Sequence, residues 1–197
     1  VWVIAKAMEQ LSQLNHHGQH VTFTINISGH TLDSDSLIPD MKRLLRFYQL
    51  DPRALIIEIT ETSAIANIEA AKRLINELRA LGCRFALDDF GSGFSSFYHL
   101  KHLPVDFVKI DGQFVQGMAT DPIDRAIVTS INDIAHSFGK LTIAEFVEGP
   151  EILGLLKQCG VDFAQGYYIS PPRQQVSALM WARAHGRVTK NHAPLRG

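Results

Sequence analysis

The sequence predicts an α/β fold with a parallel sheet, and the pattern favours an eight-stranded (β/α)8 barrel with six of its strands represented. Short β-branched runs alternate with stretches of helical periodicity. Successive strand candidates lie roughly 20 to 36 residues apart, a usual length for a β-α-β unit. No G-x-G-x-x-G follows the first strand and no P-loop motif occurs, which disfavours the dinucleotide-binding and P-loop folds.

The elements can be placed along the chain from these patterns. Strands are predicted at Val21–Ile27, Leu55–Thr60, Arg84–Asp88, Asp106–Ile110, Leu141–Glu145 and Asp162–Gly166. Helices are predicted at Trp2–Leu14, Leu37–Tyr48, Ile68–Leu81, Ile123–Phe138, Glu151–Gln158 and Val176–Ala184. We expect residues 1–185 to form the barrel and residues 186–197 to form a polar tail or linker.

Composition sets limits on the function. Of the 197 residues, 46% are hydrophobic and 20% are charged, and the net charge is −1. These values are typical of a folded domain, and the lack of a basic run argues against a nucleic acid polymer as partner. Cys83 and Cys159 form no C-x-x-C pair, which favours two reduced thiols. The sequence shows no signal peptide and no membrane-spanning run, so a cytoplasmic location is expected, either as a separate protein or as the cytoplasmic part of a membrane-anchored one.

Polar residues fall at or near the carboxyl ends of the predicted strands. In a parallel barrel these ends meet at one face, where the loops build the active site. Two further carboxylates, Asp89 and Glu148, lie in the adjoining loops. The strand-end residues are Asn26, Glu58, Asp88, Lys109, Glu145 and Gln165.

Structural explanations remain open for some of these residues. A single Asp after a strand often caps a helix or a turn, which applies to Asp89, and a similar role applies to Glu148. A buried Lys109 beside a carboxylate can be a plain ion pair. Glu58 lies among isoleucines and needs a partner, because an unpaired buried charge is costly.

The set of strand-end side chains favours a divalent metal. An amide oxygen with several carboxylates suits magnesium, manganese or calcium better than zinc. Adjacent aspartates, here Asp88 and Asp89, can share two ions, an arrangement used for in-line attack on phosphodiesters. Lys109 can orient the attacking water or stabilise charge on the phosphate.

At these residues the sequence resembles the EAL domain, a family of phosphodiesterases specific for cyclic di-GMP in bacterial signalling. The matching motifs occur in the family order. They are Asn26-Ile27-Ser28, Glu58-Ile59-Thr60-Glu61, Asp88-Asp89-Phe90-Gly91-Ser92-Gly93, Lys109-Ile110-Asp111, Ala144-Glu145-Phe146-Val147-Glu148 and Gln165-Gly166-Tyr167.

The resemblance implies a TIM-like barrel that hydrolyses cyclic di-GMP to linear pGpG with two Mg²⁺ or Mn²⁺ ions, whereas Ca²⁺ binds without supporting turnover. It implies metal ligands at Asn26, Glu58, Asp88 and Asp89, catalytic roles for Asp89, Lys109, Glu145 and Gln165, and a loop-positioning role for Glu61. Asp111 and Glu148 match motif residues with less defined roles at the substrate. A homodimer through the loop Phe90–Ser96 and fusion to sensory or GGDEF-type domains are also implied.

Two departures from the family pattern matter. The Glu-Ala-Leu tripeptide is absent from this chain. We expect it upstream of Val1 with the first two strands, and we expect the 197 residues alone to be weakly active or inactive. Phe146 stands where the family often has glycine. The alternative function is therefore a catalytically weak or silent EAL domain that acts as a cyclic di-GMP receptor or signalling adaptor.

Overall fold

The computed structural model describes residues 2–32, 34–91, 97–172 and 193–194. The chain forms two compact units. Unit 1 comprises Val1–Asp88 and Ser96–Asp106, and unit 2 comprises Asp89–Ser95 and Phe107–Gly197. The boundary falls within strand β3, between Asp88 and Asp89.

Unit 1 is built on three neighbouring parallel strands, β1 (Phe23–Ile27), β2 (Leu55–Thr60) and β3 (Arg84–Phe90). In β2, every residue except the last is buried, as is usual for parallel strands that are covered on both faces. The helical elements of this unit are α1 (Trp2–His16), α2 (Gly29–Leu32), α3 (Leu37–Phe47), η1 (Pro52–Ala54), α4 (Glu61–Ala66), α5 (Ile68–Arg79) and α6 (Phe97–His102).

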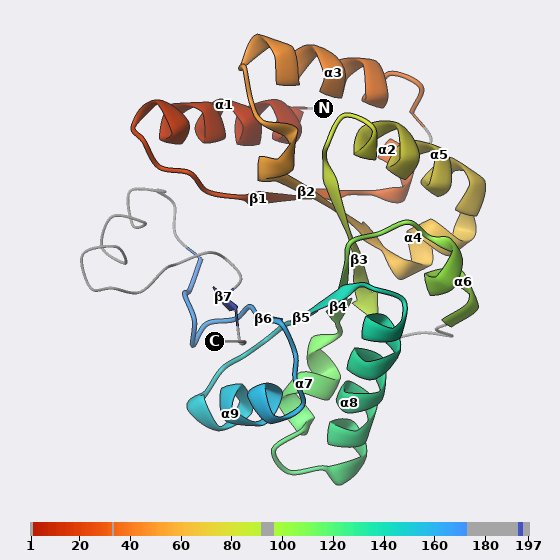
Figure 1. Cartoon of the computed structure of the whole chain (residues 1–197), viewed down its shortest axis with the longest axis vertical. Helices are drawn as coiled ribbons and strands as arrows, with labels where there is room; N and C mark the ends of the chain where they lie inside the picture. Colours follow the sequence, from red (N-terminus) through yellow and green to blue (C-terminus); the bar gives the residue numbers. More distant parts are fainter. Residues whose placement is uncertain (1, 33, 92–96, 173–192, 195–197) are drawn as a thin grey trace. The chain divides into compact units, whose positions relative to one another are not determined.

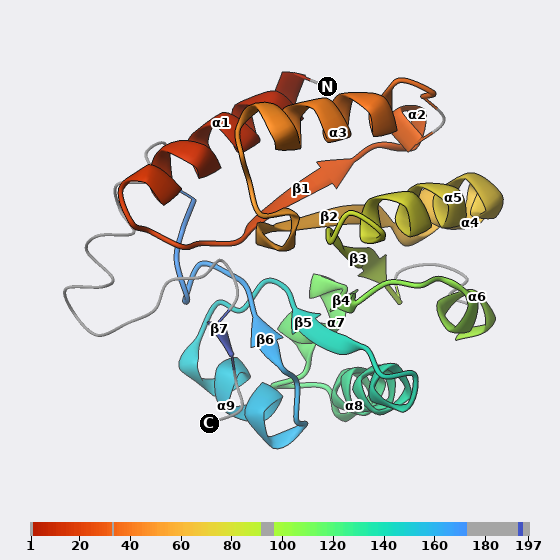
Figure 2. The same ribbon diagram turned by 45° about the horizontal axis from the view of Figure 1, so that its top comes forward.

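Apolar residues at helical spacing direct these helices onto the sheet. Helix α5 buries Ala71, Leu74, Ile75 and Leu78, which lie three or four positions apart and share one face. Helices α1 and α3 lie side by side in both ribbon views and pack against one another (Figures 1 and 2). They place Met8, Leu11 and Met41 in the core, each at most 1% exposed.

Unit 2 contains the parallel strands β4 (Phe107–Ile110), β5 (Leu141–Ala144) and β6 (Phe163–Ala164). A short antiparallel strand, β7 (Ala193–Pro194), pairs with β6. The helices are α7 (Gly112–Gly117), α8 (Pro122–Ser137) and α9 (Pro150–Gln158). Helices α7 and α8 are neighbours in Figure 1 and pack together.

A buried polar network holds α8 at the amino-terminal ends of β5 and β6. The hydroxyl of Thr142 donates to Asn132 Oδ1 at 2.7 Å, and Asp162 Oδ2 accepts from the Thr142 amide at 2.9 Å. The ring of His136 lies 2.7 Å from the same Asp162 oxygen. Because active sites of such sheets lie at the opposite, carboxyl ends of the strands, we assign this network to stability.

The predicted pattern of alternating strands and helices is confirmed. Six predicted strands and five predicted helices occur, with boundaries that differ by a few residues. Strand β3 runs two residues further than predicted, through Asp89 and Phe90. The predicted helix Val176–Ala184 and the tail apart from Ala193–Pro194 lie outside the described residues. The helices α2, α4, α6 and α7 were not predicted because four to six residues are too few to show a helical period.

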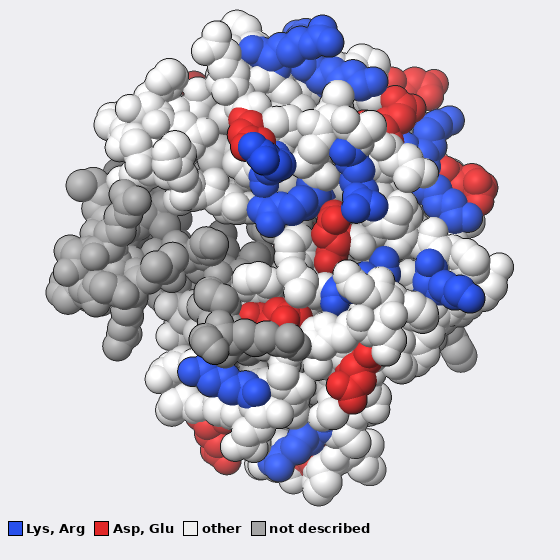
Figure 3. Space-filling model, in the orientation of Figure 1, with Lys and Arg blue, Asp and Glu red and all other residues white. Residues whose placement is uncertain are grey.

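The distribution of charge on the surface agrees with the small net charge of the chain. On the face in Figure 3, basic and acidic side chains are interspersed. Within the described residues, no helix combines the length and apolar character that a membrane span requires.

The two cysteines differ in their surroundings, and this difference gives a first prediction. Cys83 is 3% exposed, and burial raises the pKa of its thiol to about 11. Cys159 is half-buried. At pH 8 we expect iodoacetamide to alkylate Cys159 well before Cys83 in the folded protein, because the thiolate is the reactive form. Peptide mass spectrometry measures both rates, and equal rates in the folded protein would contradict the structure.

The same raised pKa affects stability at high pH. The folded state favours the neutral Cys83 thiol, so its contribution is complete below the ordinary pKa of 9.0. That contribution is lost as the pH rises through about 11. Denaturant unfolding of a Cys83→Ala variant between pH 8 and 11 should show a weaker pH dependence than the parent.

Candidate active site

Unit 1 contributes three polar side chains on one face of its sheet. Asn26 on β1 is the register partner of Glu58 on β2, and Asp88 on β3 is the partner of Thr60. Register partners point to the same face, as do residues two positions apart along one strand. Asn26, Glu58 and Asp88 therefore share a face near the carboxyl ends of their strands. Glu58 and Asp88 are buried, and Asn26 is exposed.

Unit 2 contributes a second group at the carboxyl ends of its strands. The Lys109 ammonium on β4 lies 2.7 Å from the Glu145 carboxylate, which follows β5. Lys109 pairs in register with Ile143, so Glu145, two positions later, points to the same face. Lys109 is 2% exposed, and the short distance makes this a buried ion pair in which each charge offsets the desolvation of the other.

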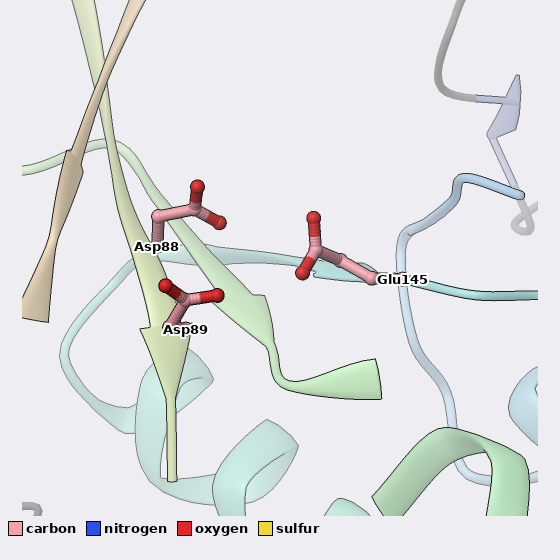
Figure 4. A group of neighbouring side chains, drawn as sticks. All are labelled: Asp88, Asp89 and Glu145. Atoms are coloured by element: carbon pink, nitrogen blue, oxygen red, sulfur yellow. The ribbon is translucent and has the colours of Figure 1, made fainter. Parts of the chain in front are cut away.

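Asp89 lies beside these groups at the end of β3. Its φ of +57° is in the left-handed region, which aspartate tolerates better than most residues. One carboxylate oxygen from each of Asp88, Asp89 and Glu145 lies within 4.8 Å of the others. Figure 4 shows the three carboxylates turned toward one another. Such a cluster of like charges is stabilised by a cation, and oxygen ligands suit Mg²⁺, Mn²⁺ or Ca²⁺.

Known proteins that resemble this chain point to one family. The profile of the EAL domain matches residues 1–172. The chain belongs to the EAL domain family. It is 42% identical over 175 residues to cyclic di-GMP phosphodiesterase PdeB of Shewanella oneidensis, a match that covers 89% of this chain and 20% of that protein. It is 33% identical to cyclic di-GMP phosphodiesterase PdeF of Escherichia coli, covering 91% of this chain and 24% of that protein.

Solved EAL structures agree with the fold. The EAL domain of Mycobacterium smegmatis DcpA superposes with a TM-score of 0.88 at 31% identity, covering 95% of this chain and 84% of the other. The complex of the PaMucR phosphodiesterase with c-di-GMP superposes with a TM-score of 0.85 at 30% identity, covering 90% and 72%. These likenesses confirm the predicted TIM-like barrel class. The chain spans about a fifth to a quarter of the two curated relatives named above.

The residues of this EAL domain fit a divalent metal. Besides the three carboxylates, the Gln165 side chain carries a buried Oε1 that has no hydrogen-bond partner among the described residues. Gln165 follows β6 and lies opposite Glu145, because Ala144 and Ala164 are register partners. A buried amide oxygen without a donor is costly, and a bound ion or its water would satisfy it.

The other predicted residues of the EAL domain lie at helix starts or after strands. Asp111 caps α7, because its Oδ1 accepts from the Gln113 amide at 2.8 Å. Glu61 is buried in the first turn of α4, and Glu148 is exposed after β5. In the loop Phe90–Ser96, Phe90 is buried and Gly91 has a φ of +105°, while residues 92–96 lie outside the described residues.

A β-bulge positions Glu145. The Gln165 amide donates to Ala144 O at 2.8 Å, and Gln165 O accepts from the Val147 amide at 3.0 Å. Regular parallel pairing would use the amide of Phe146, so one extra residue is inserted here. Phe146 has a φ of +52°, a conformation that costs about 1–2 kcal/mol for a residue with a side chain.

Gly166 completes this bulge by close approach. A Cβ atom on Gly166 would lie 2.8 Å from the Val147 carbonyl carbon and even closer to the Val147 amide nitrogen and carbonyl oxygen. The backbone of Val147 leaves no room for a methyl group. The motif alone did not reveal this reason for glycine, because the approach of Val147 is a tertiary contact.

A glycine pair tests this packing. We expect Gly166→Ala to reduce stability by about 1–3 kcal/mol, because the added methyl group overpacks the backbone of Val147. Gly154→Ala is the control, since it lies within α9 and no described atom lies within 4 Å of its Cβ position. That substitution should add about 1 kcal/mol through helix propensity. Urea unfolding measures both, and equal effects of the two substitutions would contradict the close approach.

Proposed function

We propose that this EAL domain is a phosphodiesterase that hydrolyses cyclic di-GMP to linear pGpG. The observation that carries the proposal is the convergence of the Asp88, Asp89 and Glu145 carboxylates beside the ammonium of Lys109. The names of the curated relatives and the c-di-GMP complex of a structural neighbour support the substrate.

The proposed reaction breaks one bond between phosphorus and a ribose 3′ oxygen. Water adds its oxygen to phosphorus and releases a proton to Glu145, and the 3′ oxygen leaves and becomes a hydroxyl group by taking a proton from solvent. Mg²⁺ or Mn²⁺, as a pair of ions, would supply Lewis-acid stabilisation of the phosphate charge. The residues that would hold them are Asn26, Glu58, Asp88 and Asp89.

The residues of the chain have distinct tasks in this proposal. Glu145 accepts the proton of the attacking water. Lys109 orients that water and stabilises negative charge on the phosphate, and the 2.7 Å ion pair fixes the position of both side chains. Gln165 supports Glu145 from the neighbouring strand.

The remaining predicted residues complete the site. Glu61 steadies the loop Phe90–Ser96, Asp111 holds the start of α7 after Lys109, and Glu148 lies at the substrate side. We also propose a cytoplasmic domain of residues 1–185 with a tail of residues 186–197. It would form a homodimer through the loop Phe90–Ser96 and would be fused to sensory or GGDEF-type domains.

Phe146 favours a second candidate, a receptor that binds cyclic di-GMP without hydrolysis. It places a bulky ring between the motif residues Glu145 and Glu148, where the family often has glycine. A receptor would retain the nucleotide and respond to its concentration.

A turnover assay separates the two candidates. The natural protein that carries this chain should convert cyclic di-GMP to pGpG in the presence of Mg²⁺ or Mn²⁺. Chromatography of the reaction mixture measures the product. Glu145→Gln should lower kcat by about 10²- to 10⁴-fold, because the amide cannot accept the proton. Glu151→Gln, an exposed position in the first turn of α9, is the control and should leave kcat unchanged.

The outcomes are distinct. Binding of cyclic di-GMP without product from a folded protein would favour the receptor. If a folded protein shows no binding and no product with either metal, both candidates are contradicted.

A further inference from the structure

Phe146 combines three properties that together point to a functional role. Its backbone adopts a left-handed conformation, with φ +52°. Its side chain is 55% exposed. It follows directly after Glu145, whose carboxylate contacts Lys109. An exposed aromatic ring gains little from burial, so folding alone gives no reason to keep a strained backbone here. Such outliers persist where the surrounding structure enforces them, often at functional sites.

The Phe146 side chain packs against Gly112. A Cβ atom on Gly112 would lie 2.7 Å from Phe146 Cγ and 3.0 Å from its Cβ. Phe146 therefore rests directly on the bare backbone of Gly112, three residues after Lys109. Any side chain at position 112 would displace it. The contact with Gly112 and the bulge hydrogen bonds together define where the ring stands, although more than half of its surface remains open.

Two other exposed aromatic residues belong to a segment that is hydrogen-bonded to the bulge at Phe146. Tyr167 and Tyr168 are exposed and follow Gln165, which is bonded to the bulge. The Tyr168 amide donates to Val147 O at 3.0 Å, so this segment is tied to the residue after Phe146. Exposed aromatic rings beside a phosphodiester site are suited to bind nucleobases, since every base has a face that can stack.

We propose that the ring of Phe146 is a stacking surface for one guanine base of the substrate and determines affinity rather than the rate of the chemical step. This inference rests on the proposed function, because it takes a guanine nucleotide as the ligand. It predicts that stability and affinity change in opposite directions at position 146. Glycine would remove the backbone strain and stabilise the fold, but the guanine base would lose its contact surface.

Three substitutions at position 146 distinguish the effect of the aromatic ring from the effect of the strained backbone. Phe146→Leu keeps an apolar side chain but removes the aromatic face. Phe146→Tyr keeps the face. Phe146→Gly removes the side chain and the strain. Phe138→Leu is a matched control, because Phe138 is also a partly exposed phenylalanine of unit 2 but lies before the amino-terminal end of β5.

The dissociation constant for cyclic di-GMP is measured by calorimetry with Ca²⁺, and KM and kcat are measured with Mg²⁺. We expect Phe146→Leu and Phe146→Gly to raise Kd and KM about 5- to 100-fold with kcat within about threefold of the parent. Phe146→Tyr and Phe138→Leu should stay within about twofold of the parent. Phe146→Gly should also raise Tm by about 2–4 °C.

Contrary results have separate meanings. Equal or tighter binding by Phe146→Gly would show that the ring obstructs the site or is idle, and would overturn the inference. A loss of kcat with unchanged Kd in Phe146→Leu would also overturn it, because the ring would then act on the catalytic groups. If the parent neither binds nor hydrolyses cyclic di-GMP, the proposed function itself fails, and this inference fails with it.

Discussion

The parallel register of neighbouring strands is the constraint on which the site depends. In unit 1 it places Asn26 beside Glu58, with Asp88 on the same face. In unit 2 it places Glu145 two positions beyond the partner of Lys109, which allows their 2.7 Å ion pair. A shift of one residue in any pairing would turn a polar or charged side chain to the opposite face. The neighbours of Glu58 and Lys109 are apolar and buried, so these two charged side chains are what distinguish the observed register from a shifted one.

Much of this arrangement could be predicted from the sequence because strand ends and polar residues are both visible in it. Glu58 and Lys109 stand out as charges within apolar runs, and each lies where the predicted strand places it. The local backbone could not be predicted. The bulge at Phe146 and the approach of Gly166 to Val147 depend on how β6 meets β5, which no local pattern reports. The short helices also escaped prediction, because α4 and α7 are set by the caps Thr60 and Asp111 rather than by periodicity.

The two ends of the unit 2 strands show how one sheet divides stability from chemistry. At the amino-terminal ends, Thr142 and Asp162 are buried in a polar network with α8. At the carboxyl ends, the charged pair of Lys109 and Glu145 is buried and Phe146 holds an unfavourable backbone conformation. Unfavourable arrangements of this kind are expected where a site is prepared for a ligand, and the well-bonded opposite end offsets their cost.

Metal binding tests the central claim most directly and does not depend on turnover. Electron paramagnetic resonance of free Mn²⁺ can be used to titrate the natural protein and an Asp88→Asn/Asp89→Asn variant, with an Asp133→Asn variant on α8 as control. We predict that the parent and the control bind Mn²⁺ and that the double variant loses this binding while it remains folded by circular dichroism. Equal Mn²⁺ binding by the parent and the double variant would contradict the assignment of this acidic cluster as the metal site.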